Sequence, residues 1–110
     1  MTNASTPLDR IFQALSDPTR RAVVERLALG PASVSELAHP FSMALPSFAQ
    51  HLRVLEGCGL VVSRKTGRVR TYALEAEALS GAQDWLQGQR DQWTRRLDQL
   101  DHYLLQMKET

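Results

Sequence analysis

The sequence predicts a mainly α-helical domain that carries one β-hairpin near its middle. Apolar residues recur at helical spacing through the first half of the chain. Two short β-rich stretches then flank a glycine, and the last third of the chain is a proline-free segment with a helical pattern. A length of 110 residues favours a single domain, which we expect to span residues 1–110.

The N-terminal third is expected to form two short helices. Four apolar residues at i, i+3, i+4 and i+7 spacing predict the first: Leu8, Ile11, Phe12 and Leu15. Thr6-Pro7 suits its start, because threonine caps helices and proline fits the first helical position. Asp17-Pro18 opens a second helix in the same way, and Gly30-Pro31 ends it.

A third and a fourth helix are expected next. Ser33 followed by Glu36 is a capping-box pattern that starts the third helix. Pro40 ends or bends it, because proline lacks the N–H that the helix needs. The fourth helix is expected over about 46–57, and Gly59 suits the left-handed position that closes a helix. Three residues form the apolar face of this fourth helix: Phe48, Leu52 and Leu55.

A β-hairpin and a long helix complete the predicted order. The stretches 60–65 and 68–74 predict two strands joined through Thr66-Gly67, so that the hairpin covers about 60–74. The final helix is expected over about 76–107. A tight helix pair followed by a β-hairpin is the winged form of the helix-turn-helix, in which the second helix of the pair is the recognition helix.

The outer face of the fourth helix has the residue types of a DNA reader. Successive helical residues are about 100° apart, so Ser47, Gln50 and Arg53 should face away from the apolar side. Gln50 suits pairing with adenine, and Arg53 suits guanine or a phosphate. His51 lies at the border of the apolar face, where it suits either packing or a phosphate contact. Any amphipathic helix has a polar outer face, so this pattern alone does not decide the function.

The net charge of +1 conceals an uneven distribution. Residues 46–74 contain five basic residues and one acidic residue, whereas residues 75–110 contain four basic and seven acidic residues. A basic block suggests contact with a polyanion, although solvated basic strands would have the same composition. Four basic residues cluster around the expected hairpin tip and suit the DNA backbone or minor groove: Arg64, Lys65, Arg68 and Arg70.

Four segments resemble the ArsR family of winged helix-turn-helix repressors: FQALSDPTRRAVVERL, SVSELA, AQHLRVLEGCGLV and GRVRTYAL. The resemblance covers nearly the whole chain and is strongest to a branch that lacks the metal-binding cysteines. It implies a double-stranded DNA partner and dimerisation through the first and last helices. Ala44 and Ala49 stand where the family commonly has serine. The fourth helix is therefore expected to fray at its start or to be capped by Ser47.

The last helix carries an apolar stripe at nearly heptad spacing. A helix of about 30 residues is roughly 45 Å long, which exceeds a small winged-helix core. We expect the excess stripe and the first helix to pair with a second copy, which would place two recognition helices about 34 Å apart. The aromatic residues Trp85, Trp93 and Tyr103 would alternatively line an effector pocket. The expected interface residues are Leu8, Ile11, Phe12, Leu86, Trp93, Leu97, Leu100, Leu104 and Met107.

Metal and catalytic chemistry have little support in the sequence. His39, His51 and His102 are far apart, and no nucleophile has a base in a recognisable motif. Metal-sensing relatives place cysteines in the third helix, where this chain has ELAHPF. The single cysteine, Cys58, excludes an intrachain disulfide and suits a small buried residue, with a redox role left open. We expect no cofactor, no metal and no enzyme activity.

The sequence therefore predicts a sequence-specific, double-stranded DNA-binding transcriptional regulator, a repressor that acts as a homodimer on a palindromic or pseudo-palindromic operator. The chain has no run of about 18 apolar residues and no secretory signal, so a cytoplasmic location is expected. Two alternatives stay open: a winged-helix module that binds protein instead of DNA, and a thiol- or metal-responsive sensor. The identity of a small-molecule effector is left unknown.

Overall fold

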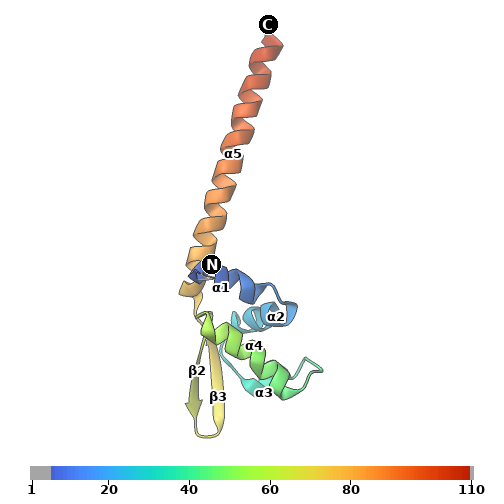
Figure 1. The fold of residues 1–110 in the computed structure, drawn as a ribbon, viewed down its shortest axis with the longest axis vertical. Helices are drawn as coiled ribbons and strands as arrows, with labels where there is room; N and C mark the ends of the chain where they lie inside the picture. The colour runs from blue at the N-terminus through green and yellow to red at the C-terminus, as the bar shows by residue number, and fades with distance from the viewer. Residues whose placement is uncertain (1–5, 110) are drawn as a thin grey trace, which may run out of the picture. The chain divides into compact units, whose positions relative to one another are not determined.

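The computed structural model describes residues 6–109 and divides at Ser80 and Gly81 into two compact units. The elements of the first unit are α1 (Pro7–Leu15), α2 (Pro18–Leu27), β1 (Ala32–Ser33), α3 (Val34–Ala38), α4 (Leu45–Gly57), β2 (Val61–Thr66), β3 (Val69–Leu74) and the 3-10 turn η1 (Ala76–Leu79). Strands β2 and β3 form a hairpin that projects beyond the helices of this unit (Figure 1). Helix α5 (Ser80–Glu109) makes up the second unit. A mainly α-helical fold with a β-hairpin wing is thus confirmed.

Helices α1, α2 and α3 begin where the sequence predicts, because each start has a capping side chain. The hydroxyl of Thr6 accepts a hydrogen bond from the N–H of Asp9, whose carboxylate accepts from the N–H of Thr6. Asp17 caps α2 by accepting from the N–H of Arg20. The capping box predicted for α3 is also present. These bonds satisfy N–H groups that a helix leaves without internal partners.

The two ends of α4 differ in how they are closed. Ala44 occupies the N-cap position without a side-chain bond, and Ser47 lies inside the first turn, so the expectation that Ser47 caps this helix is wrong. At the other end, Gly59 has a φ of +83°, and the N–H of Leu60 donates to the carbonyl of Leu55 at 3.0 Å. The left-handed closure predicted at Gly59 is confirmed.

The three strands form one antiparallel sheet in the order β1-β3-β2. The predicted hairpin corresponds to β2 and β3, but its turn lies one residue later than predicted, at Gly67 and Arg68, because Thr66 still pairs with Val69. Gly67 has a φ of +63°, which suits the first position of a type II′ turn. The sequence pattern does not predict β1, since two residues are too few to show an alternation.

The apolar face predicted for α4 lies at the centre of the core. Phe48, Leu52 and Leu55 are 0%, 2% and 0% exposed. The ring of Phe41, from the loop before α4, packs against that of Phe48 with the centroids 5.4 Å apart. Four other large residues are also almost fully buried: Val23, Leu37, Leu60 and Val61. This packing turns the opposite face of α4 outward.

Helix α5 is 30 residues long. The helix predicted over about 76–107 begins instead as the 3-10 turn η1, and the α-helix starts at Ser80. Six apolar residues of its predicted stripe are between 43% and 62% exposed: Leu86, Trp93, Leu97, Leu100, Leu104 and Met107. Within residues 6–109, no helix combines the length and the apolar content that a membrane crossing requires.

Candidate nucleic-acid interface

The outward face of α4 presents three of the residues predicted to contact DNA. Ser47, Gln50 and Arg53 are exposed, whereas the apolar residues between them point into the core. The guanidinium of Arg53 donates to the side-chain oxygen of Gln50 through Nε at 3.2 Å and through Nη2 at 2.6 Å. This contact uses the acceptor of Gln50, so the pair presents N–H donors outward. Such a surface matches acceptors on purine edges and phosphates.

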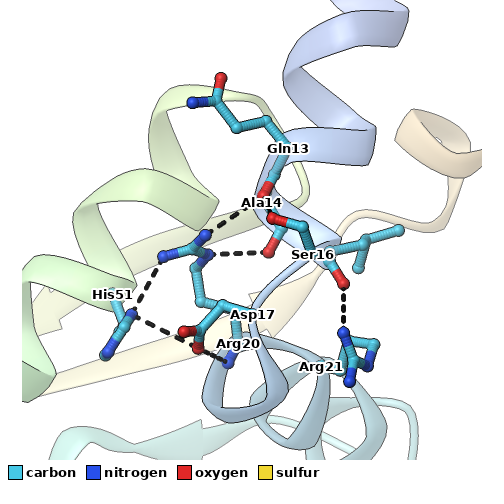
Figure 2. A network of polar contacts seen from close by, with 8 residues as sticks. Gln13, Ala14, Ser16, Asp17, Arg20, Arg21 and His51 are labelled. Atoms are coloured by element: carbon cyan, nitrogen blue, oxygen red, sulfur yellow. Dashed lines mark hydrogen bonds and ion pairs between the residues drawn. The ribbon is translucent and has the colours of Figure 1, made fainter.

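His51 lies apart from this outward face. Its side chain is 22% exposed, and its Nδ1 is 3.1 Å from Nη1 of Arg20 on α2 and 3.8 Å from Oδ2 of Asp17 (Figure 2). The border position predicted for His51 therefore corresponds to a contact between two helices. Sequence reasoning missed Arg20, because 31 residues separate it from His51 and no spacing rule connects them.

Arg20 also reaches the end of α1. Its Nε donates to the carbonyl of Ala14 at 2.7 Å, and its Nη2 donates to the carbonyl of Gln13 at 3.1 Å (Figure 2). The backbone N–H of Arg20 is the main reason that the pKa of the Asp17 carboxyl is lowered, and the positive charge of Arg20 lowers it further. Asp17, Arg20 and His51 thus form one polar cluster, which joins α1, α2 and α4.

The basic residues of the wing are divided between its faces and its tip. Arg64, Lys65, Arg68 and Arg70 are all exposed. Lys65 and Arg70 are directly opposite each other in the β2–β3 register. Because side chains alternate along a strand, Arg64 lies on the other face of the sheet, while Arg68 lies in the turn. The structure therefore separates the predicted cluster into a pair, Lys65 and Arg70, and two single cations.

A second polar link joins the wing to the end of α4. Arg70 Nη1 donates to Oγ of Ser63 at 2.9 Å, and that hydroxyl donates to Oε2 of Glu56 at 2.8 Å. Glu56 belongs to α4, Ser63 to β2 and Arg70 to β3. Arg70 is one of the cations predicted to contact DNA, but its hydrogen bond to Ser63 was not predicted. These two hydrogen bonds hold the wing at a defined position beside α4.

The residues considered for metal or thiol chemistry do not gather. Among residues 6–109, no group of three or more histidine, cysteine, aspartate or glutamate side chains is placed to hold a metal ion. Cys58 is half-buried, and its thiol donates to the carbonyl of Leu55 at 3.3 Å. His102, on α5, contacts Gln106 at 3.2 Å. These positions offer no additional support for a sensor site.

The predicted interface residues differ in their exposure. Ile11 is only 4% exposed within the single chain, whereas Phe12, its neighbour on α1, is 37% exposed and Leu8 is half-buried. Ile11 therefore lies in the interior of this chain. The apolar residues predicted along α5 are the larger exposed set.

The chain resembles known regulators over most of its length. A family model described as a helix-turn-helix domain matches residues 15–64. The HTH-type transcriptional regulator Rv2034 of Mycobacterium tuberculosis is 46% identical over 89 residues, which cover 81% of this chain and 80% of that protein. The transcriptional repressor SdpR of Bacillus subtilis is 28% identical over 79 residues, which cover 72% of this chain and 88% of that protein.

A solved structure agrees with these relatives. The crystal structure of an ArsR family transcriptional regulator, RHA00566, superposes with a TM-score of 0.78 and 54% identity, and covers 81% of this chain and 98% of that chain. The helix-turn-helix match includes α2, α3 and α4, which hold and present the outward face described above. The chain therefore belongs to the ArsR family of winged helix-turn-helix, DNA-binding transcriptional regulators.

Proposed function

We propose that this protein is a repressor that binds a pseudo-palindromic double-stranded DNA operator as a homodimer, with α4 in the major groove. The observation that carries the proposal is the outward donor surface of Ser47, Gln50 and Arg53, which stands on a helix whose other face is fully buried. A helix anchored in this way presents its side chains at a fixed angle, as base readout requires. We also propose that the protein is not an enzyme. We place it in the cytoplasm, where a DNA-binding regulator has access to the chromosome.

The charge arrangement of the wing supports a phosphate contact. Lys65 and Arg70 are cross-strand neighbours, and like charges directly opposite each other destabilise a hairpin. A phosphate placed between them would relieve this repulsion. Arg68, in the exposed turn, suits the backbone or the minor groove beside the site that α4 reads.

The exposed stripe of α5 supports the homodimer. A soluble chain rarely leaves so many large apolar side chains in water, and their nearly heptad spacing is the pattern of helices that pair. A second copy supplies an identical stripe, so a two-fold interface satisfies both copies at once. We retain Leu8 and Phe12 of α1 in this proposed interface and omit Ile11, because Ile11 is already buried.

The DNA proposal is tested on operator fragments that the protein selects from genomic DNA. Gln50→Ala should blur the base preference at one operator position, because it removes a base-reading amide. Arg68→Ala should weaken binding to all sequences and make the salt dependence of log K shallower by about one unit. Arg95→Ala, an exposed arginine on α5, is the matched control and should leave both properties unchanged.

Two outcomes would contradict this assignment. If Gln50→Ala and Arg68→Ala both retain wild-type operator binding in fluorescence anisotropy titrations, these residues do not form the interface. If the protein binds no DNA even at low salt, where phosphate contacts are strongest, a module that binds protein becomes the better interpretation.

The homodimer is tested by analytical ultracentrifugation. Leu97→Glu should convert the dimer to a monomer, because it places a charge in the apolar stripe. Gln99→Glu is the control, since it adds the same charge about 200° away around the helix. A dimer that survives Leu97→Glu, or a wild-type protein that sediments as a monomer, would exclude this interface.

A further inference from the structure

We propose that Arg20 is a positioning residue for operator recognition, which holds the reading helix α4 in register with α1 through one shared guanidinium. The inference rests on the proposed function, in which α4 reads DNA. The geometry that carries it is the convergence of two backbone carbonyls of α1 and one ring nitrogen of α4 on Arg20 (Figure 2).

The guanidinium is suited to this place because it donates in several directions within one plane. Nε and Nη2 reach the carbonyls of Ala14 and Gln13, which lie in the last turn of α1. The carbonyl of Gln13 also accepts from the N–H and the hydroxyl of Ser16, the residue that caps this helix end. Nη1 reaches Nδ1 of His51. Three acceptors on two helices are thus held by one side chain, and a lysine, with its single nitrogen, lacks that planar reach.

The contact also favours one tautomer of His51. Because arginine offers only donors, a hydrogen bond from Nη1 requires Nδ1 to accept, and a neutral ring then carries its proton on Nε2. Asp17 lies 3.8 Å from the same Nδ1 and is itself held by the N–H of Arg20 at 3.0 Å. Arg20 of α2 and Asp17, the N-cap residue of that helix, are the charged groups that face the ring. Nδ1 is therefore occupied within the protein, and a nucleic acid would meet the ring from another side.

Directional bonds add something that apolar packing does not. The buried residues of α4 fix its distance from the core, but apolar contacts tolerate small slides and rotations. A hydrogen bond weakens steeply once its distance or angle changes. His51 follows Gln50 directly and precedes Arg53 by two residues, so the bond that holds the ring also holds the rotation of the reading face. A displacement at the end of α1 would reach that face through Arg20.

Two substitutions of His51 separate this role from direct DNA contact. Asn places its amide near the position of Nδ1, whereas Gln places its amide near the position of Nε2. Positioning through Arg20 predicts that His51→Asn retains operator affinity within about threefold, because an acceptor for Nη1 remains. It also predicts that His51→Gln loses about tenfold, the equivalent of about 1.4 kcal/mol. A direct contact of Nε2 with DNA predicts the opposite order.

Arg20→Lys supplies the complementary test. It should lower operator affinity about tenfold and leave low-salt affinity for nonspecific DNA nearly unchanged, because charge is conserved while alignment is lost. The double variant Arg20→Lys with His51→Gln should bind the operator as tightly as the single variant with the lower affinity, because both substitutions break the same contact between Arg20 and His51. Arg21→Lys is the matched control: Arg21 donates to the carbonyl of Leu15 at 2.8 Å, also at the end of α1, and within residues 6–109 it makes no hydrogen bond or ion pair to α4.

Several results would overturn the proposal. Wild-type operator affinity in Arg20→Lys contradicts it, as does a stronger loss in His51→Asn than in His51→Gln. Equal losses of operator affinity in Arg20→Lys and Arg21→Lys would mean that the contacts to the end of α1 account for the effect and that the contact to α4 does not. Thermal melts identify any variant that does not fold, in which case the His51 pair decides. If Gln50→Ala and Arg53→Ala weaken binding while Arg20→Lys does not, only this inference fails; if none of them does, the proposed function fails.

Discussion

Replacing Phe48 with alanine should destabilise the domain more than any surface substitution. Phe48 is 0% exposed, and its ring packs against that of Phe41 at a centroid distance of 5.4 Å. Phe48→Ala removes this aromatic pair and leaves a cavity beneath α4. The side chain lies on the face opposite Gln50 and Arg53, so the substitution tests whether the reading face depends on the core behind it.

The expected magnitude follows from the burial. Truncation of a buried phenylalanine costs about 3–5 kcal/mol. Domains of this size have a free energy of unfolding of about 5–15 kcal/mol, so the loss is a large share of the total. At roughly 4 °C or more for each kcal/mol, the melting temperature should fall by at least about 12 °C.

Urea and thermal unfolding, followed by far-ultraviolet circular dichroism, measure this loss. Leu29→Ala is the control, because Leu29 is 85% exposed and its truncation should change stability by about 0.5 kcal/mol or less. A Phe48→Ala protein that melts within a few degrees of the wild type would refute the assigned core. Such a result would also remove the reason for placing Ser47, Gln50 and Arg53 outward.

Three further predictions concern backbone and titration. Gly59→Ala should cost about 1–2 kcal/mol in urea unfolding, because a φ of +83° disfavours any side chain, even though the added carbon meets no neighbouring atom. Gly57→Ala, at the last position of α4, should instead stabilise by up to about 0.5 kcal/mol, and a loss in both variants would contradict the backbone reason. The pKa of the Asp17 carboxyl is lowered in the folded state, so its charged form stabilises the fold above pH 3.8, the ordinary pKa. This stability is lost as the pH falls through the lower pKa of the folded state, so acid unfolding should be less steep in Asp17→Asn when it is followed by circular dichroism. Burial raises the pKa of Tyr72 above 10.0, so the associated stability is present below pH 10 and lost at higher pH, and alkaline unfolding monitored by circular dichroism should be less steep in Tyr72→Phe.

The starts of α1, α2 and α3 were the part of the fold that sequence reasoning predicted best. The capping residues Thr6, Asp17 and Ser33 act on N–H groups three residues away, so the pattern and the bond are both local. The start of α4 was predicted less well. Ala44 occupies the N-cap position without a side-chain bond, and the start signal that remains is Pro46 in the first turn.

For the candidate site, the sequence predicted the outward residues of α4 and the basic residues of the wing. It did not predict which of these basic residues share a face of the hairpin. The register that places Lys65 opposite Arg70 depends on a turn at Gly67 and Arg68, one residue beyond the predicted turn. A shift of one residue in a hairpin changes which residues are directly opposite. The pairing of the cations, on which the phosphate argument depends, therefore needed the structure.

The sequence by itself determined the order of the elements, the apolar face of α4 and the left-handed closure at Gly59, because periodicity and turn chemistry act over a few residues. Only the tertiary structure decided that β1 joins the sheet and that Arg20 meets His51. The physical reason is distance along the chain. A contact between residues 31 positions apart depends on how α1, α2 and α4 pack around a common core, and no local pattern encodes that arrangement.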